Sequence, residues 1–596
     1  MNSLSKSAFS VLATIFKWGE VASQRDLATR CGLSVGTVNA TCRKLQAAGL
    51  LEGYAITPAG MEALEPYRVE NAVIMAAGLS SRFAPISYEK PKGLLTVRGE
   101  VLVERQIRQL QEAGITDITV VVGYKKEFFF YLEDTFGVRI VVNDEYASRN
   151  NNSSLMRVRE KLGNTYICSS DDYFTENPFE RYVYQAYYAA EYCEGPTDEW
   201  CMKLGPQNRI VGVTVGGADS WIMLGHVYFD RAFSQTFRRI LEAEYDLPET
   251  ADKLWEELYI DHIKELPMIA RKYEPGIIYE FDSLDELRDF DPQFLRNVDS
   301  EVFDNIVDVL ACQRDDICEV YPLKQGLTNL SCHFSVNGDE YVYRHPGAGT
   351  EAIIDRRGEM EAQRIAKRLG LDDTFVYEDP ERGWKISRYI PLCKQLDVHD
   401  RGELAEAMRI ARELHGSDAA IDRTFDFYDE SLRYERLLRS RGSEALSVPG
   451  FADNVERIRR LHDAFEAEGG RTCLCHNDFF DLNFLIDGDD KYYLIDWEYA
   501  GMADSTQDFG TFVVCCQLSD AEAEDALSLY LGHEPTEHEC RRHWAAVCFA
   551  GWCWYLWSLF KEEEGEFVGE WLYIYYRYAT RYLDKALALY GVAKEA

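Results

Sequence analysis

The chain has 596 residues, 46% of them hydrophobic, which is enough apolar side chain for several folded domains and excludes a disordered chain. Its 64 basic and 101 acidic residues give a net charge of −37, which disfavours general affinity for nucleic acid or for an anionic membrane surface. Sixteen cysteines without a CxxC pair, and the lack of an apolar leader, predict reduced thiols in a cytoplasmic protein.

Residues 1–66 predict a small helical domain. They carry six basic and five acidic side chains, so nearly all of the excess negative charge lies downstream. The predicted elements are a helix over Phe9 to Phe16, a helix capped by Ser23, a third helix from Val35 to Ala48, and a short β wing. This order resembles the winged helix of bacterial regulators.

The third helix leaves two uses for this domain open. Its outer face would carry Thr37, Asn39, Arg43 and Lys44, where winged helices read a DNA groove. The near-neutral charge and the few basic side chains favour the alternative, a docking module that has lost DNA binding. We therefore expect small-molecule partners and keep DNA as the less favoured partner.

Residues 70–292 predict an α/β domain that binds a nucleotide. An apolar strand over Asn71 to Ala76 runs into a loop of small residues, AAGLSSRF, and PKGLL follows at 91–95. Backbone N–H groups of such a loop can surround phosphate oxygens, and basic side chains can neutralise their charge. The candidate nucleotide-binding residues are Ala77, Gly78, Ser81, Arg82 and Lys92, and the two cations are also candidate catalytic residues.

Downstream, helices alternate with strands, which predicts a parallel, Rossmann-like sheet. These elements are expected over Val103–Ala113, Ile118–Val122, Glu127–Phe136 and Val138–Asn143. Two later strands, at 166–168 and 277–281, lead into acidic residues. Because Mg²⁺ prefers hard oxygen ligands, Asp171 and Asp282 are candidate metal ligands, with Asp172 an open alternative to Asp171.

Over roughly residues 70–290 this pattern, with NNSSL at 151–155, resembles Lic-type CTP:phosphocholine cytidylyltransferases. The resemblance implies Mg²⁺ and CTP at this site, attack by the phosphate of phosphocholine, and pyrophosphate as the leaving group. A quaternary ammonium has no N–H donor and is held by aromatic faces. Trp200 and Trp221 are candidates for this role, with Glu280 as countercharge; core packing is the alternative for each Trp.

Residues 300–596 predict a kinase-like domain organised around CHNDFFDLNFLIDGDDKYYLIDWEYAG at 475–501. An acidic turn at 487–490 predicts a hairpin that brings Asn483 and Asp496 to one end of a sheet. The pattern HxDxxxxN followed by IDW resembles the choline kinase and aminoglycoside phosphotransferase superfamily, and most closely the Lic-type choline kinases. The resemblance implies that Asp478 is catalytic and that Asn483 and Asp496 hold Mg²⁺ beside ATP.

The start of this domain resembles a kinase small lobe. Gly326-Leu327-Thr328-Asn329 precedes a strand over Cys332–Val336, and a second strand ends at Arg344. Arg344 stands where protein kinases carry Lys, and Glu359 on the next helix would hold it against the ATP phosphates. Asp508, in QDFG, is expected to brace the site rather than to bind metal.

An apolar run of 16 residues, Ala545 to Phe560, falls short of the ~20 needed to cross a bilayer and predicts a buried helix without membrane insertion. Trp554 and Trp557 are three residues apart and share one side of it. The resemblance places such a pair around the trimethylammonium group; core packing is the alternative. Cys473 and Cys475 beside His476 suggest zinc, but the spacing fits no common site and buried thiols are favoured.

Together these features predict a multidomain α/β and α+β enzyme with a winged helix, a nucleotidyltransferase domain and a two-lobed kinase-like domain. It would phosphorylate choline with ATP and then transfer CMP from CTP to phosphocholine. The alternatives are the same reactions on ethanolamine or another amino alcohol, or a choline-responsive regulator. Intact Gly78, Lys92, Asp282, Asp478 and Asp496 argue against a regulator without chemistry.

Overall fold

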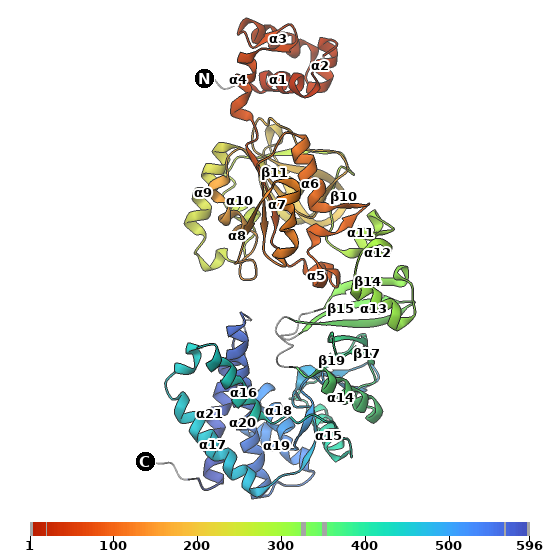
Figure 1. Cartoon of the computed structure of the whole chain (residues 1–596), viewed down its shortest axis with the longest axis vertical. Helices are drawn as coiled ribbons and strands as arrows, with labels where there is room; N and C mark the ends of the chain where they lie inside the picture. Colours follow the sequence, from red (N-terminus) through yellow and green to blue (C-terminus); the bar gives the residue numbers. More distant parts are fainter. Residues whose placement is uncertain (1–3, 20, 324–328, 348–353, 566–567, 593–596) are drawn as a thin grey trace. The chain divides into compact units, whose positions relative to one another are not determined.

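The computed structural model describes residues 4–19, 21–323, 329–347, 354–565 and 568–592. The chain divides into two compact units, Met1–Asp304 and Asn305–Ala596, through which Figure 1 traces the backbone. Both of the first two predicted domains lie in the first unit. Helix α13 (Glu301–Leu310) spans the division.

The N-terminal domain is the winged helix that the sequence predicts. Its elements are α1 (Lys6–Trp18), α2 (Gln24–Cys31), α3 (Val35–Ala47), the wing strands β1 (Leu51–Glu52) and β2 (Ala55–Ile56), and α4 (Pro58–Leu64). Ser23 and Ser34 begin α2 and α3, each accepting a hydrogen bond at 3.1 Å from the backbone N–H three residues on. On α3, Thr37, Arg43 and Lys44 are exposed, whereas Asn39 is half-buried.

Helix α1 packs against the α/β domain that follows. The rings of Tyr67 and Tyr184 stack 5.5 Å apart, and Phe9 lies 5.3 Å from Tyr184. Phe16 meets Tyr182 edge-on, and the Tyr182 side chain is 96% buried. The winged helix therefore shares a small apolar core with the next domain, which a composition shift between the two could not reveal.

The α/β domain is built on a seven-stranded sheet of order β12-β10-β11-β8-β3-β6-β7. The strands are β3 (Asn71–Ala76), β6 (Ile118–Val122), β7 (Arg139–Val142), β8 (Thr165–Ser169), β10 (Tyr187–Leu204), β11 (Ile210–Phe229) and β12 (Ile269–Lys272). Strands β8, β3, β6 and β7 are mutually parallel, as expected. The sheet as a whole is mixed, however, because β10 and β11 form a long antiparallel hairpin and β11 pairs antiparallel with β8.

Apolar side chains of β3 alternate between two cores, one on each face of the sheet. Val73 packs with the helices on one face, and Ala72 and Ile74 pack on the other. The first face is covered by α8 (Asn152–Arg157), α9 (Arg231–Glu244) and α10 (Trp255–Asp261), the second by α6 (Leu102–Glu112) and α7 (Tyr131–Phe136), as Figure 1 shows. The single helix expected over Glu127–Phe136 is instead a 3₁₀ turn, Lys126–Phe129, followed by α7.

Two short strands carry the acidic side chains past the edge of the main sheet. β9 (Asp172–Phe174) pairs antiparallel with β13 (Ile278–Glu280), which places Asp172 opposite Glu280. The predicted strands at 166–168 and 277–281 therefore end side by side at one site. The remaining elements before the division are α5 (Ile86–Glu89), the hairpin of β4 (Thr96–Val97) and β5 (Glu100–Val101), α11 (Leu284–Phe290) and α12 (Phe294–Asn297).

The second unit begins with a kinase-type small lobe. Its sheet has five antiparallel strands in the order β14-β15-β16-β18-β17. Helix α14 (Arg356–Leu369) lies between β16 and β17 in the chain. The strands are β14 (Ile317–Pro322), β15 (Asn329–Val336), β16 (Asp339–Pro346), β17 (Phe375–Asp379) and β18 (Trp384–Arg388). Of the expected glycine loop, Gly326, Leu327 and Thr328 lie outside the described residues.

The large lobe is mainly helical. Its helices are α15 (Arg401–Gly416), α16 (Phe427–Ser440), α17 (Phe451–Glu468), α18 (Gln507–Cys515), α19 (Asp520–Leu531), α20 (Glu537–Glu563) and α21 (Trp571–Leu589). The predicted apolar helix is the buried part of α20. Gly551 lets α21 approach it closely, because a Cβ there would lie 2.8 Å from the backbone nitrogen of Ala579. No helix among the described residues is long and apolar enough to cross a membrane.

Two short ladders in the large lobe carry the catalytic segment. β20 (Thr472–Cys475) pairs with β23 (Gly501–Asp504), and β21 (Phe484–Ile486) forms the predicted hairpin with β22 (Tyr492–Leu494). β19 (Lys394–Gln395) adds a third strand to that hairpin. Asn483 and Asp496 thus come to the same end of the hairpin, as expected.

Two candidate active sites

Lys92 and Asp171 meet at the carboxyl ends of the parallel strands β3 and β8. Lys92 Nζ lies 2.5 Å from Asp171 Oδ2, and Ser169 Oγ also donates to this carboxylate. Burial opposes ionisation of Asp171, but the ammonium outweighs it and holds the pKa of Asp171 below its ordinary value. A cation expected to face phosphate and a carboxylate expected to bind metal are therefore adjacent.

A second pair lies across the same site. Arg82 Nη1 is 2.9 Å from Asp282 Oδ1, which joins the loop after β3 to the segment after β13. Glu280 is partly open to solvent and lines the cavity beside this pair, where desolvation by the surrounding protein, followed by the charge of Asp171, raises its pKa to about 8. Asp172, fully buried, has neither carboxylate oxygen hydrogen-bonded within the described part of the chain.

The site opens into two neighbouring cavities of about 460 Å³ each. One follows the small-residue loop and is lined by Ala77, Gly78 and Ser154, among others. The other is lined by Arg82, Asp282 and Trp200. Asn151 and Ser169 belong to both linings, so the cavities adjoin at Ser169, which donates to Asp171. Lys92 and Asp171 themselves are in neither lining. Trp221 and Ser81 are in neither lining.

Trp200 shares its cavity with a half-buried carboxyl that the sequence did not single out. Glu256, in the first turn of α10, accepts hydrogen bonds from Asn151 Nδ2 at 3.1 Å and from the Tyr188 hydroxyl at 3.5 Å. Burial raises the pKa of Glu256 to about 7. Aromatic faces and carboxyls therefore meet in one cavity, which suits a compact organic cation. Trp221 instead has Lys272 Nζ 4.2 Å from its ring centroid.

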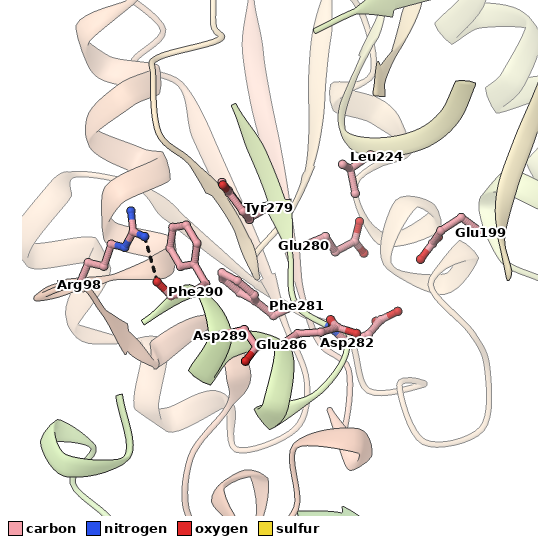
Figure 2. A pocket seen from close by; sticks show the side chains of 10 residues that line it. All are labelled: Arg98, Glu199, Leu224, Tyr279, Glu280, Phe281, Asp282, Glu286, Asp289 and Phe290. Atoms are coloured by element: carbon pink, nitrogen blue, oxygen red, sulfur yellow. Dashed lines mark hydrogen bonds between the residues drawn. The ribbon is translucent and has the colours of Figure 1, made fainter. Parts of the chain in front are cut away.

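A third cavity, of about 580 Å³, lies on the other side of Glu280. Figure 2 shows Glu199, Glu280 and Asp282 toward one side of it. At the opposite side, Arg98 stacks on the ring of Phe290 and donates to its carbonyl at 2.9 Å. Glu199, Glu280 and Asp282 line both this cavity and the one around Trp200, so the two are continuous along a wall of carboxylates.

In the second unit, the catalytic segment is held by a buried carboxylate beneath it. Asp508 accepts hydrogen bonds from the backbone nitrogens of His476 at 2.9 Å and Asn477 at 2.6 Å, and from His415 Nε2 at 2.9 Å. Asn477 and Asp496 both have a φ of 64°, a left-handed backbone that few residues with a Cβ adopt. Asp508 thus has the bracing position expected for it.

Asp478 and Asn483 are in direct contact. The Asn483 amide nitrogen donates to Asp478 Oδ2 at 2.8 Å and to the Asp478 carbonyl at 2.7 Å. Since both hydrogen bonds use the nitrogen, Asn483 Oδ1 is the atom positioned to bind an ion. Burial, and then the charge of Asp496, raises the pKa of Asp478 well above its ordinary range.

Arg344 connects the two lobes of the second unit. It contacts Glu359 on α14, and its Nη1 lies 3.1 Å from Asp496 Oδ1. Burial disfavours the Glu359 carboxylate, but Arg344 and neighbouring cations lower its pKa to about 2. The expected Arg344–Glu359 pair is therefore present, and the same guanidinium also reaches the candidate metal ligand.

Trp554 and Trp557 lie edge-to-face in α20, with ring centroids 5.9 Å apart. Trp554 also meets Tyr499 edge-on at 5.2 Å and donates from Nε1 to Thr511 Oγ1 at 2.8 Å. Tyr575 is also buried, and burial, followed by the charges of Cys515 and Asp478, raises its pKa well above the ordinary value. Tyr578 turns away and donates to the Leu518 carbonyl at 2.8 Å.

The thiols of Cys473 and Cys475 lie 3.7 Å apart and cluster with His415, not with the adjacent His476. Both nitrogens of His415 have hydrogen-bonding partners, Asp508 and the Tyr530 hydroxyl. His476 instead uses Nε2 with the Ile495 carbonyl at 2.9 Å. This arrangement supports the favoured interpretation of buried thiols beneath the catalytic segment.

Sequence reasoning missed Glu256, Tyr188 and Lys385. Glu256 lies in an ordinary amphipathic helix start, where no pattern marks it, and Tyr188 lies in a strand rich in tyrosine. Lys385, whose Nζ lies 3.7 Å from Glu359 Oε1, did carry a weak signal, as a charged residue between the apolar Trp384 and Ile386 of β18.

Three family models match the chain, one in each predicted domain. They are "Winged helix-turn-helix DNA-binding" over residues 4–52, "MobA-like NTP transferase domain" over 72–191 and "Phosphotransferase enzyme family" over 319–544. The order of the three agrees with the folds described above.

Curated relatives match the middle and C-terminal parts. The choline-phosphate cytidylyltransferase of Streptococcus pneumoniae is 35% identical over 38% of this chain and 98% of its own length. A 2-aminoethylphosphonate cytidylyltransferase of Lancefieldella rimae is 36% identical over 37% of this chain and 92% of its own. Protein LicA of Haemophilus influenzae is 28% identical over 44% of this chain and 98% of its own. The chain therefore belongs to the Lic-type cytidylyltransferase family and is an enzyme that joins this nucleotidyltransferase to a LicA-like phosphotransferase domain and a winged helix.

Proposed function

We propose that the chain catalyses two consecutive steps: ATP phosphorylates choline, and CTP then converts phosphocholine to CDP-choline. The single observation that supports this most is the cavity around Trp200, where aromatic rings and the carboxyls of Glu256 and Glu280 adjoin Arg82 and Asp282. It offers a place for a cation next to charges suited to a triphosphate. A kinase domain on the same chain could supply the phosphorylated alcohol.

In the cytidylyl transfer, a phosphocholine oxygen attacks the α-phosphorus of CTP, and the bond to the pyrophosphate oxygen breaks. Lys92 and Arg82 would neutralise the phosphate oxygens where charge accumulates. Asp171 and Asp282 are carboxylates paired with these cations at one site, and this set of hard oxygen donors fits Mg²⁺. The ion, when bound, would neutralise charge on the phosphate oxygens of CTP.

In the phosphorylation, the choline hydroxyl attacks the γ-phosphorus of ATP, and the bond to ADP breaks. Asp478 would orient the hydroxyl and accept its proton. Asn483 Oδ1 and the Asp496 carboxylate are the oxygen donors that fit Mg²⁺, which would neutralise the phosphate oxygens. Trp554 and Trp557, with Tyr499 and Tyr575 nearby, would face the trimethylammonium group.

The test separates the two sites. Asp478→Asn should abolish phosphorylation of choline, because the hydroxyl loses its oriented acceptor, and should leave conversion of supplied phosphocholine by CTP intact. Asp489→Asn, in the exposed turn of the same hairpin, is the matched control. Products are followed by mass detection with ATP, CTP, Mg²⁺ and a panel of amino alcohols. Loss of both activities in a folded Asp478→Asn protein would contradict two independent sites.

A second acceptor is favoured by one observation, the match to a 2-aminoethylphosphonate cytidylyltransferase at similar identity. The primary ammonium of 2-aminoethylphosphonate could donate hydrogen bonds to Glu256 and Glu280, whereas a trimethylammonium group could only contact rings and charges. Phosphocholine, phosphoethanolamine and 2-aminoethylphosphonate should therefore be compared as acceptors. If 2-aminoethylphosphonate gives the highest kcat/KM of the three, it and not phosphocholine is the acceptor of the cytidylyl group.

A further inference from the structure

A row of three ionisable side chains crosses the small-lobe sheet of the second unit. Arg344 on β16 is in register with Lys385 on β18, and Lys385 is in register with Glu378 on β17. Directly opposed residues of antiparallel strands project from the same face. All three side chains are at least nine-tenths buried. Charges are rarely buried in this way without partners.

This row faces Glu359 on α14. Arg344 and Lys385 both approach Oε1 of Glu359, Lys385 Nζ from 3.7 Å, while Arg356 Nη1 lies 3.1 Å from Oε2. Glu359 is fully buried. Glu359 is therefore surrounded by three cations, whereas the usual ion pair of a kinase small lobe needs only one cation.

Arg344 also forms a second ion pair, in which its Nη1 lies 3.1 Å from Asp496 Oδ1. If Mg²⁺ and ATP bind as proposed, Asp496 turns to the ion, and Arg344 turns to the phosphates. When Arg344 contacts the phosphates, its ion pair with Glu359 weakens. Glu359, which is fully buried, then needs another cation to offset its charge. Lys385 can supply that charge, because it lies opposite Arg344 in the sheet and its ammonium approaches the same oxygen of Glu359, Oε1.

We propose that Lys385 is a positioning residue for nucleotide binding, which keeps Glu359 compensated while Arg344 contacts the ATP phosphates. The proposal rests on the proposed kinase activity. Lys385 itself has no assigned contact with ATP, so it acts through Glu359 and Arg344 rather than on the reacting atoms.

The competing explanation is that Lys385 offsets the buried Glu378. Neither carboxylate oxygen of Glu378 has a hydrogen-bonding partner within the described residues. Burial, and then the charge of Glu359, raises the pKa of Glu378, which favours the neutral, protonated form of this carboxyl. A protonated carboxyl needs no cation, which favours Glu359 as the group that Lys385 serves.

The first experiment measures binding of a non-hydrolysable ATP analogue with Mg²⁺ to the full chain by calorimetry. Lys385→Met should weaken binding about tenfold and raise the KM for ATP similarly, and Lys385→Arg should recover most of the loss. The KM for choline and the cytidylyl transfer should not change. Lys394→Met is the matched control, since Lys394 is an exposed lysine of the same unit that pairs with Glu403.

The double variant Lys385→Met/Glu378→Met separates the two explanations. If Lys385 serves Glu359, the double variant stays as weak in binding as Lys385→Met. If it serves Glu378, removing both charges restores the affinity, and the proposal is overturned. Lys385→Gln replaces the methionine variant if that protein does not fold. Unchanged analogue affinity in a folded Lys385→Gln protein also overturns it, whereas failure of the wild type to bind the analogue would overturn the proposed kinase activity itself.

Discussion

Lys92 Nζ lies 2.5 Å from Asp171 Oδ2, so a candidate phosphate cation and a candidate metal ligand are paired with one another before any substrate is considered. Both belong to segments that leave the sheet at neighbouring parallel strands, β3 and β8. The pair satisfies two side chains that would otherwise be buried charges. Mg²⁺ and CTP would take over both partners at once, since the ion suits the carboxylate and the phosphates suit the ammonium.

Lys92→Ala is therefore expected to lower CDP-choline formation by roughly 100-fold, through lost stabilisation of charge in the transition state. Kinase activity should persist. Steady-state rates with supplied phosphocholine give the measurement, and Lys203→Ala, an exposed lysine of the β10 strand, is the control. A folded Lys92→Ala protein with wild-type turnover would remove Lys92 from the site.

The paired strand ends show how far sequence reasoning reached. Lys92, Asp171, Arg82 and Asp282 could be nominated because a small-residue loop and two acidic strand ends are local patterns. The pairing of Lys92 with Asp171 and of Arg82 with Asp282 could not be predicted, because it depends on the register of β3 with β8 and of β9 with β13. The long β10–β11 hairpin was missed for a similar reason. Its strands mix buried, half-buried and exposed positions and are interrupted by bulges, so they lack a regular alternation of apolar residues.

Deleting residues 1–66 is expected to destabilise the α/β domain without removing either set of candidate catalytic residues. The deletion would expose Tyr182 and the ring of Tyr184, which pack against Phe16 and Phe9. Losing the burial of several rings costs a few kcal/mol, and we expect the first thermal transition to fall by about 5 °C or more.

Lys17→Ala is the control for this deletion. It removes the contact with Glu180 at 3.3 Å, but the Lys17 side chain is 54% exposed, so its loss should change stability little. An unchanged transition in the deleted protein would show that the shared core contributes nothing measurable. Cytidylyl transfer by the deleted protein, assayed well below its transition, should remain.

The pKa of Glu256, about 7, predicts a pH dependence of phosphocholine binding. Ionisation occurs as the pH rises through this value, and the carboxylate then attracts the ammonium group. Affinity should therefore increase from about pH 6.5 to about pH 8.5, by up to about tenfold. Glu256→Gln should weaken binding most at the upper end and flatten the profile.

Calorimetric titration of phosphocholine at each pH measures this effect. Glu257→Gln is the matched control, because that neighbouring side chain caps α10 through the backbone nitrogen of Leu254 and is absent from the cavity lining. Glu280, with a pKa of about 8, would leave a smaller rise in the Glu256→Gln profile. A full pH dependence in Glu256→Gln would assign the titration to other groups.

Trp554→Leu tests recognition of the trimethylammonium group by the kinase. A desolvated cation against an indole face is worth ~2 kcal/mol, so choline affinity should fall roughly 30-fold while ATP affinity changes little. Ethanolamine affinity should fall less, since its ammonium can use hydrogen bonds instead. Isothermal titration of the folded variants measures all three ligands.

Trp552→Leu is the control that separates recognition from packing. Trp552 and Trp554 are both at least 96% buried in α20, so either substitution removes a similar apolar area from the core and should lower the unfolding temperature comparably. Trp552, however, packs on Phe451 and Tyr555, whereas Trp554 meets Trp557 and Tyr499 near the catalytic segment. Equal losses of choline affinity in the two variants would assign both rings to the core, and an isolated loss in Trp554→Leu would place the cation against that ring.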